Sequence, residues 1–224
     1  MTAIRVLSLD LDDTLWPVGP VIEAAEAALL DWIRSRCPAA ARGHDVASMR
    51  SMRQRIAAEF PERSHDLTFL RHRALGEQFQ AAGYGGSVCE EAMEVFLAAR
   101  NRVELYDDVR PALARLRAGY RLFAVSNGNA DLHRCGVGSL FDGHVTAIAA
   151  GAAKPDARIF AALVEMAGVG AAEIMHVGDD PVADVEGARR AGMQSVWLNR
   201  GGVRAWPAGL RPPARTIASL AEIL

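Results

Sequence analysis

The chain has 224 residues, half of them hydrophobic, and a formal net charge of −2 at pH 7. This length suits one large domain, or a medium domain with an insertion, around a substantial core. The charge gives no support to a nucleic-acid-binding surface, because phosphate backbones require a basic face. No segment has the apolar length needed to cross a bilayer, and the N-terminal apolar stretch is too short for a signal peptide. We therefore expect a cytoplasmic protein without a membrane or nucleic-acid partner.

The first predicted element, from Ile4 to Leu11, is a short strand that is buried on both faces, because it is an apolar run bounded by charge. Asp10, Asp12 and Asp13 follow at its end, where open α/β folds place their ligands. Carboxylates this close repel one another unless a cation or hydrogen bonds keep them ionised. The alternative is that Asp12 and Asp13 only cap the helix that follows or form a turn.

The segment from 17 to about 102 has helical composition, rich in Ala, Arg, Glu, Leu and Met. Breakers separate four amphipathic helices, which we predict over 21–35, 45–60, 66–82 and 88–102. Such a block between a first strand and the rest of an α/β domain is typical of an inserted cap.

After residue 103, short apolar runs alternate with helical patterns. We predict strands over 121–125, 145–149, 174–177 and 195–198, and helices over 109–118, 130–135, 157–167 and 182–191. This alternation favours a doubly wound, mostly parallel, Rossmann-like sheet whose strand ends share one edge. The three cysteines are widely spaced and form no CxxC pair, so we expect reduced thiols.

Two of these later strand ends carry polar groups. Ser126–Gly128 offers a hydroxyl and backbone N–H groups, which suits an anion, although an N-cap and a turn would explain it too. Gly178–Asp180 supplies two carboxylates and Asp184 a third, whereas capping needs only one. Lys154, the only lysine in the chain, could be a surface accident or a point charge for a phosphate oxygen and a carboxylate.

These elements, in this order, resemble the four motifs of the haloacid dehalogenase superfamily of phosphohydrolases: Asp10–Thr14, Ser126–Gly128, Lys154-Pro155, and Gly178–Asp180 with Asp184. The resemblance implies an α/β core domain over 1–16 and 103–224 and a helical cap domain over 17–102. Around its motifs the core looks similar to bacterial phosphatases that act on flavin mononucleotide (FMN) and on 5-amino-6-(5-phospho-D-ribitylamino)uracil.

The resemblance also implies a mechanism. Asp10 would attack phosphorus to form an aspartyl phosphate, and Asp12 would protonate the leaving group and later deprotonate water. Mg²⁺ would be bound by the Asp10 carboxylate, the Asp12 backbone carbonyl and Asp179, with Asp184 or Asp180 in or behind that set of ligands.

The phosphoryl oxygens would be held by the Ser126 hydroxyl, the Asn127 N–H and Lys154, while Thr14 would brace the first motif. In the cap, Arg71 is the preferred candidate for a substrate contact, although a solvated arginine on a charged helix face is the plainer interpretation. Trp16 could stack on a flat substrate ring or anchor the cap hinge.

The leading hypothesis is thus a Mg²⁺-dependent phosphatase of a small phosphorylated metabolite, acting as a monomer or homodimer. Haloacid dehalogenases resemble this chain but carry an uncharged residue in place of Asp12, so this carboxylate favours phosphoryl transfer. A phosphosugar mutase would use the same core. A non-catalytic binding protein would have lost one of the catalytic groups, and Asp10, Asp12, Lys154 and Asp179 are all present.

Overall fold

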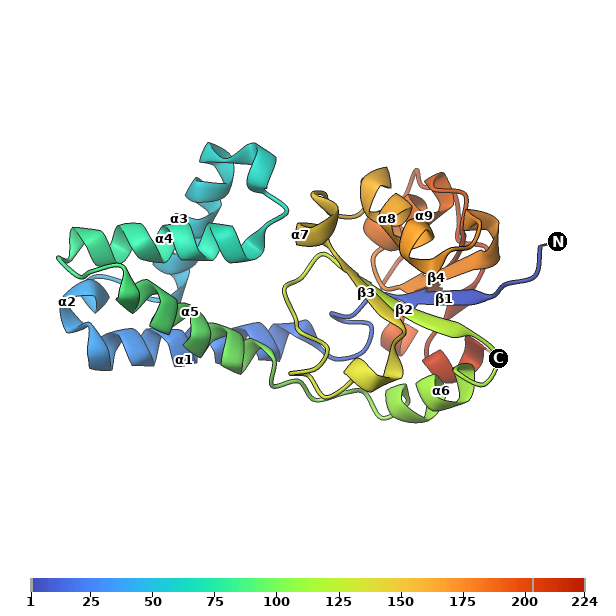
Figure 1. The fold of residues 1–224 in the computed structure, drawn as a ribbon, viewed down its shortest axis with the longest axis horizontal. Coiled ribbons are helices and arrows are strands. Elements are labelled where there is room, and N and C mark those ends of the chain that lie inside the picture. Colours follow the sequence, from blue (N-terminus) through green and yellow to red (C-terminus); the bar gives the residue numbers. More distant parts are fainter. Residues whose placement is uncertain (1, 203, 224) are drawn as a thin grey trace. The chain divides into compact units, whose positions relative to one another are not determined.

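The computed structural model describes residues 2–202 and 204–223, whose elements are drawn in Figure 1. The strands are β1 (Val6–Leu9), β2 (Arg121–Ser126), β3 (Gly143–Thr146), β4 (Ile174–Gly178), β5 (Gln194–Leu198) and β6 (Thr216–Ile217). The helices are α1 (Val18–Arg36), α2 (Pro38–Ala41), α3 (Val46–Glu59), α4 (Leu67–Ala81), α5 (Ser87–Arg100), α6 (Val109–Leu116), α7 (Ala147–Ala150), α8 (Ala157–Ala167) and α9 (Gly187–Arg190).

Contacts divide the chain into two units. An α/β unit comprises Met1–Pro17, Glu104–Gly128 and Gly136–Leu224, and a helical unit comprises Val18–Val103 and Asn129–Cys135. The helical unit thus takes in a short segment that directly follows β2 and its polar end. Within the described residues, no helix combines the length and the apolar content that a membrane crossing requires.

The α/β unit is built on a parallel six-stranded sheet in the order β3-β2-β1-β4-β5-β6, which confirms the predicted fold class. All four residues of β1 are buried, as expected of a strand covered on both faces. Helices α8 and α9 cover one face of the sheet, and α6 with the C-terminal turn covers the other (Figure 1). The two-residue strand β6 was not predicted.

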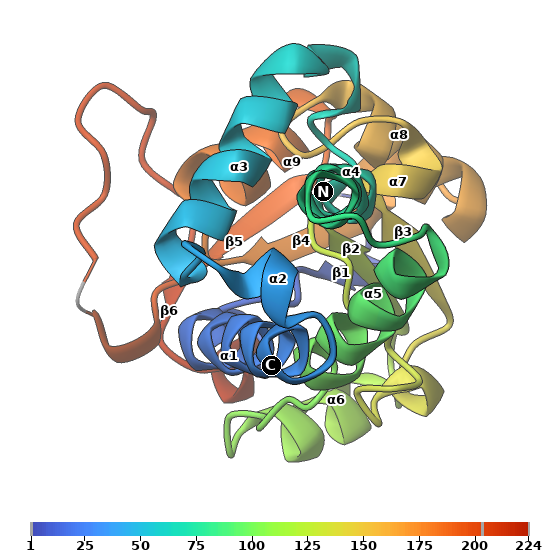
Figure 2. The same ribbon diagram turned by 90° about the vertical axis from the view of Figure 1, so that its left-hand side faces the viewer.

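The central position of β1 brings the functional strand ends together. Leu9 pairs with Ala124 of β2 on one side and with Val177 of β4 on the other. The residues that follow these three strands therefore emerge side by side at one edge, and Figure 2 shows β1 lying between β2 and β4. This edge is the point where the strand order changes direction, which is where α/β sheets bind ligands.

The helical unit has its own apolar core, which includes Leu29, Ile33, Phe79 and Phe96 and is contributed by helices α1 to α5. Capping residues start two of its helices where the sequence predicts: the Asp66 carboxylate, for example, accepts a hydrogen bond from Phe69 N at 2.9 Å and caps α4, whereas α1 begins at Val18, ahead of its predicted start. The four predicted helices of this segment are all present, and the short helix α2 lies where a breaker was expected.

Two predicted elements of the later chain are wrong. Residues 130–135 form a turn and not a helix, because the Asp131 carboxylate accepts from His133 N and Arg134 N and Gly136 (φ 72°) ends the turn. The predicted strand 145–149 ends at Thr146, whose hydroxyl accepts from Ala149 N at 3.1 Å and starts helix α7.

Candidate active site

Asp10 and Lys154 form the centre of the site, inside the α/β unit. Lys154 Nζ donates to Asp10 Oδ1 and to Asp184 Oδ1, both at 2.6 Å, and to the Val125 carbonyl at 2.9 Å. These three bonds use every proton of the ammonium group. Because the Lys154 side chain is only 2% exposed, the only lysine of the chain is a buried part of this network and not a surface residue.

Three carboxylates converge here. Asp10, Asp179 and Asp184 each offer an oxygen, and these oxygens lie within 4.8 Å of one another. Asp184, rather than Asp180, completes this group, because the Asp180 carboxylate accepts from Val182 N and Ala183 N and caps the π-helical turn Pro181–Glu186. The arrangement is a set of hard oxygen donors that could bind a divalent cation.

The pKa values of the three carboxyl groups indicate that negative charge exceeds positive charge at the site. Burial, together with the neighbouring Asp184 carboxylate, raises the pKa of Asp10 to about 8 in spite of Lys154. Burial and Asp184 likewise raise the pKa of Asp179 to about 6. For Asp184 burial acts in the same direction, but Lys154 and His176 outweigh it and lower the pKa. The Lys154 ammonium, together with Arg204 at the Asp179 carboxylate, therefore does not fully compensate the three carboxylates, and a bound cation would.

A buried chain of hydrogen bonds links Asp184 to polar side chains inside the sheet. His176 Nε2 lies 3.1 Å from Asp184 Oδ1, and His176 Nδ1 lies 2.8 Å from Ser8 Oγ. Burial lowers the pKa of His176, so the ring is neutral at pH 7. Because an ionised carboxylate only accepts, Nε2 carries the ring proton and Nδ1 accepts from the Ser8 hydroxyl. Neither residue was predicted, although a polar side chain inside each apolar strand was a visible signal.

The second strand end holds Lys154 in place. Asn127 Oδ1 accepts from Lys154 N at 2.7 Å, and Asn127 Nδ2 donates to Lys154 O at 3.0 Å. The buried Ser126 hydroxyl accepts from Gly128 N at 2.9 Å. The Asn127 side chain is thus committed to the backbone of Lys154, which leaves its own N–H group as the candidate ligand for a phosphoryl oxygen.

The loop after β1 is a tight turn with several anchors. Asp13 has a left-handed backbone (φ 59°) and donates its N–H to the Trp16 carbonyl at 2.7 Å. The Trp16 indole Nε1 donates to Asp12 Oδ1 at 2.8 Å. Thr14 is fully buried, and its Oγ1 has no hydrogen-bond partner among the described residues.

Arginines from the end of the chain bind this loop. Arg200 donates from Nε and Nη2 to the Thr14 carbonyl at 3.0 and 2.7 Å, and from Nη1 to Asp108 at 3.0 Å. Arg204 forms ion pairs with Asp179 and, at 3.7 Å, with Asp13. No local pattern in the sequence indicates either arginine, since each lies about 190 residues along the chain from the first loop that it contacts.

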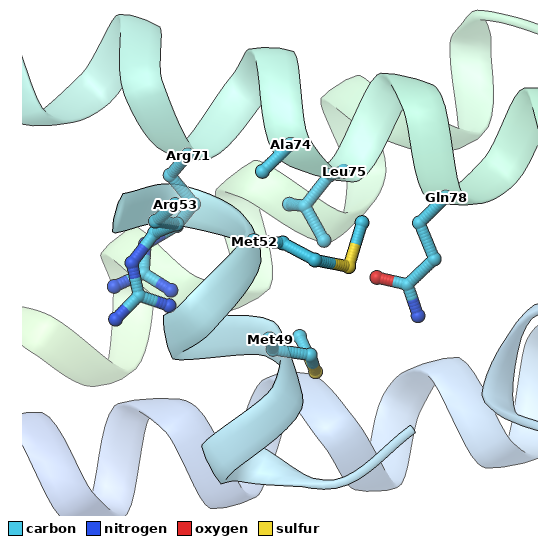
Figure 3. A pocket seen from close by; sticks show the side chains of 7 residues that line it. All are labelled: Met49, Met52, Arg53, Arg71, Ala74, Leu75 and Gln78. Carbon is cyan, nitrogen blue, oxygen red and sulfur yellow. The ribbon is translucent and has the colours of Figure 1, made fainter. Parts of the chain in front are cut away.

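Arg71 lies in the helical unit, away from solvent. Its guanidinium stacks on Phe96 at 3.4 Å from the ring centroid and lies 3.7 Å from Glu26, and its Nη1 has no hydrogen-bond partner among the described residues. Figure 3 shows the guanidinium groups of Arg53 and Arg71 side by side at one end of a cavity of about 10 Å³, which is enough for about one water molecule. Burial and the nearby Arg53 lower the pKa of Arg71 to about 9.

Comparisons with known proteins agree with this geometry. The model of the haloacid dehalogenase-like hydrolase family matches residues 4–192. The 5-amino-6-(5-phospho-D-ribitylamino)uracil phosphatase YigB of Escherichia coli (strain K12) is 31% identical, over 99% of this chain and 96% of its own. A phosphoserine phosphatase of Thermus thermophilus is 35% identical over 59% of this chain and 55% of its own.

Among solved structures, one described as a 2-haloacid dehalogenase from Pseudomonas syringae pv. Tomato DC3000 has a TM-score of 0.91 and 36% identity, covering 97% of this chain and 95% of that one. The Bacillus subtilis protein YfnB, solved bound to magnesium, has a TM-score of 0.66 and 20% identity, covering 99% and 97%. The second likeness shows the shared fold alone.

Proposed function

The chain belongs to the haloacid dehalogenase-like hydrolase family and is a phosphatase of small phosphorylated metabolites, and we propose that its substrate is FMN or another riboflavin-pathway phosphate. The observation that carries the proposed mechanism is the pairing of the Asp10 carboxylate with the Lys154 ammonium at a sheet edge. The name of the E. coli relative supports this substrate class. Because the match covers nearly the whole of both chains, we extend the substrate class of that relative to this protein.

In the proposed reaction Asp10 attacks phosphorus. An Asp10 carboxylate oxygen forms a bond to phosphorus while the bond from phosphorus to the leaving oxygen breaks, and Asp12 gives its proton to that oxygen. Water then attacks the aspartyl phosphate, its proton goes to Asp12, and the Asp10 carboxylate leaves. Overall, one phosphate monoester and one water molecule are converted to one alcohol and one inorganic phosphate.

The acidic group fits Mg²⁺, because the pKa values of Asp10 and Asp179 stay raised in spite of the Lys154 and Arg204 cations beside them. We propose that Asp10, Asp179 and Asp184 hold the ion together with the Asp12 backbone carbonyl. When bound, the ion supplies positive charge that keeps the carboxylates ionised and offsets the charge of the phosphoryl group.

The remaining core residues hold the phosphoryl group in this proposal. The Ser126 hydroxyl and the Asn127 N–H bind its oxygens, and Lys154 binds one by redirecting the proton that it donates to Asp10 Oδ1 in this structure. Asn127 fixes the Lys154 backbone through its side chain. Thr14 braces the loop that carries Asp10 and Asp12 from a fully buried position.

In the helical unit we propose that Arg71, with Arg53 beside it, contacts an anionic or carbonyl group of the substrate. Glu26 is surrounded by the guanidinium groups of Arg50, Arg53 and Arg71 at 3.0, 2.5 and 3.7 Å, so this cluster has a surplus of two positive charges. The Arg50 side chain is 53% exposed and solvated, but that of Arg71 is 8% exposed, so an anion would compensate the charge of Arg71 better than water does.

A first experiment measures phosphate release from a panel that includes FMN, pyridoxal phosphate, a hexose 1-phosphate and 4-nitrophenyl phosphate, each with Mg²⁺ and with chelator. We expect metal-dependent release that is fastest with the riboflavin-pathway compound. Isomerisation of the hexose phosphate without phosphate release would indicate a mutase instead.

A parallel arm measures halide release from a 2-haloacid, because a similar structure is described as a dehalogenase. Asp10→Asn serves as the control: it removes the nucleophile but keeps the size of the side chain, so it should abolish turnover while circular dichroism stays unchanged. Halide release without phosphate release would contradict the proposed function.

A further inference from the structure

Trp16 lies at the end of the loop that carries Asp10 and Asp12. It is fully buried, and backbone pairing between Asp12 and Trp16, with the bond from Asp13 N to Trp16 O, closes the loop into a turn. Neither sequence-based interpretation, a stacking platform for the substrate or a hinge anchor, uses the indole N–H. The structure gives that group a partner of its own.

The partner is a side chain that the proposed reaction uses. Trp16 Nε1 donates to Asp12 Oδ1 at 2.8 Å, whereas Trp197 and Trp206 donate to the backbone carbonyls of Asp179 and Leu210. An indole N–H only donates, and the unprotonated oxygen of a carboxyl group is its better acceptor. The bond to Oδ1 therefore favours Oδ2 as the oxygen that carries the proton when Asp12 is neutral.

We propose that Trp16 is a positioning residue for the general acid: it binds Oδ1 of Asp12 and so makes Oδ2 the atom that gives the proton to the leaving oxygen and later takes one from water. This inference rests on the proposed phosphatase mechanism and deepens it. A carboxyl group free to rotate would present its proton in many directions, and proton transfer requires one geometry within hydrogen-bond reach of the substrate.

The dependence on leaving group separates this role from simple packing. An alkyl phosphate expels a basic alkoxide that needs the Asp12 proton as the bond to phosphorus breaks, while a nitrophenolate leaves with little help. Losing the indole N–H should therefore slow cleavage of the alkyl ester selectively. Loss of packing around the loop would slow both substrates alike.

The test is Trp16→Phe, which keeps an aromatic ring in the buried position and removes the donor. We expect kcat/KM to fall on the order of 10- to 100-fold for the best alkyl phosphate, a share of what general acid catalysis contributes. For 4-nitrophenyl phosphate we expect a fall of less than about threefold. Trp32→Phe is the matched control, because Trp32 packs against the core of the helical unit.

Each outcome has one meaning. If the wild-type protein releases no phosphate from either ester with Mg²⁺, the proposed function fails. If the wild-type protein is active and Trp16→Phe loses the same factor on both esters, or on neither, the positioning role is overturned while the phosphatase function stands.

A second measurement covers the case in which Trp16→Phe does not fold. The chain has four tryptophans, so a ¹⁵N-indole spectrum resolves four N–H signals. In Asp12→Ala the Trp16 signal should move upfield and exchange faster with solvent, with the Trp32 signal as reference. A Trp16 signal that keeps its position and exchange rate would overturn the inference.

Discussion

Replacing Lys154 with methionine tests whether the buried ammonium stabilises the sheet edge. Methionine has a similar shape, but the substitution removes both 2.6 Å bonds to Asp10 and Asp184 and the 2.9 Å bond to the Val125 carbonyl. Removing one partner of a buried ion pair typically costs about 3–5 kcal/mol, because the remaining charge stays uncompensated. We expect a loss of that size in the free energy of unfolding at pH 7 in chelator.

The loss should depend on pH in a definite direction. A carboxyl group whose pKa is higher in the folded state than in the unfolded state binds more protons when folded, so it favours folding at low pH and not at high pH. Asp184 carries the charge that Lys154 compensates at neutral pH, because Lys154 lowers the pKa of Asp184 against the effect of burial. Without the ammonium, burial should raise the pKa of Asp184, so the folded variant binds a proton there that the folded wild-type protein does not. The difference between variant and wild type should therefore be largest near pH 8 and shrink toward pH 5.

Urea unfolding at pH 8, 7 and 5 measures these differences, with Arg158→Met as control. Arg158 pairs with Asp156, but the two side chains are 66% and 40% exposed, so its loss should cost less than about 1 kcal/mol. Saturating Mg²⁺, at about 100 times its dissociation constant, should restore roughly 2.7 kcal/mol. A Lys154→Met variant as stable as Arg158→Met at pH 7 would refute the reasoning.

Three further changes probe the same edge. Gly178→Ala should cost about 1–3 kcal/mol and weaken Mg²⁺ activation, because its Cβ would lie 2.2 Å from Asp184 Cγ; an unaltered metal titration would contradict this. Asp179→Ala should raise the Mg²⁺ concentration for half-maximal activity on the order of tenfold or more, and an unchanged value argues against its ligand role. Arg200→Gln should lower stability by about 1–3 kcal/mol, since two charge-assisted bonds to the Thr14 carbonyl disappear; coincident urea curves would rule this out.

The sequence was sufficient for the parts of the fold that depend on local pattern. The apolar runs predict β1, β2, β4 and β5 because buried parallel strands are continuous and short, and the helices of the second unit are predicted by composition and capping residues such as Asp66. Strand β6 pairs with β5 and has only two residues, so it is too short to show a pattern in the sequence. The turn over 130–135 has helical composition, but the Asp131 side chain competes for its N–H groups.

In the site, too, local patterns in the sequence predict the residues at the strand ends but not the contacts between segments far apart in the chain. The motifs placed Asp10, Ser126, Lys154 and Asp179 at strand ends or in adjoining loops, and parallel pairing brings those strand ends to one edge. The supporting contacts are different, because Arg200 reaches the first loop from far along the chain and no local spacing encodes that meeting.

The burial of Lys154 has a consequence for the chemistry of the whole surface. Because this is the chain's only lysine and it is 5% exposed, acylating reagents and lysine-modifying enzymes meet no accessible side-chain amine on the folded protein. The flanking carboxylates outweigh burial and raise the pKa of its ammonium group, which makes it still less nucleophilic. Acylation of a side-chain amine must therefore pass through an opening of this sheet edge, and its rate reports that opening at a single residue.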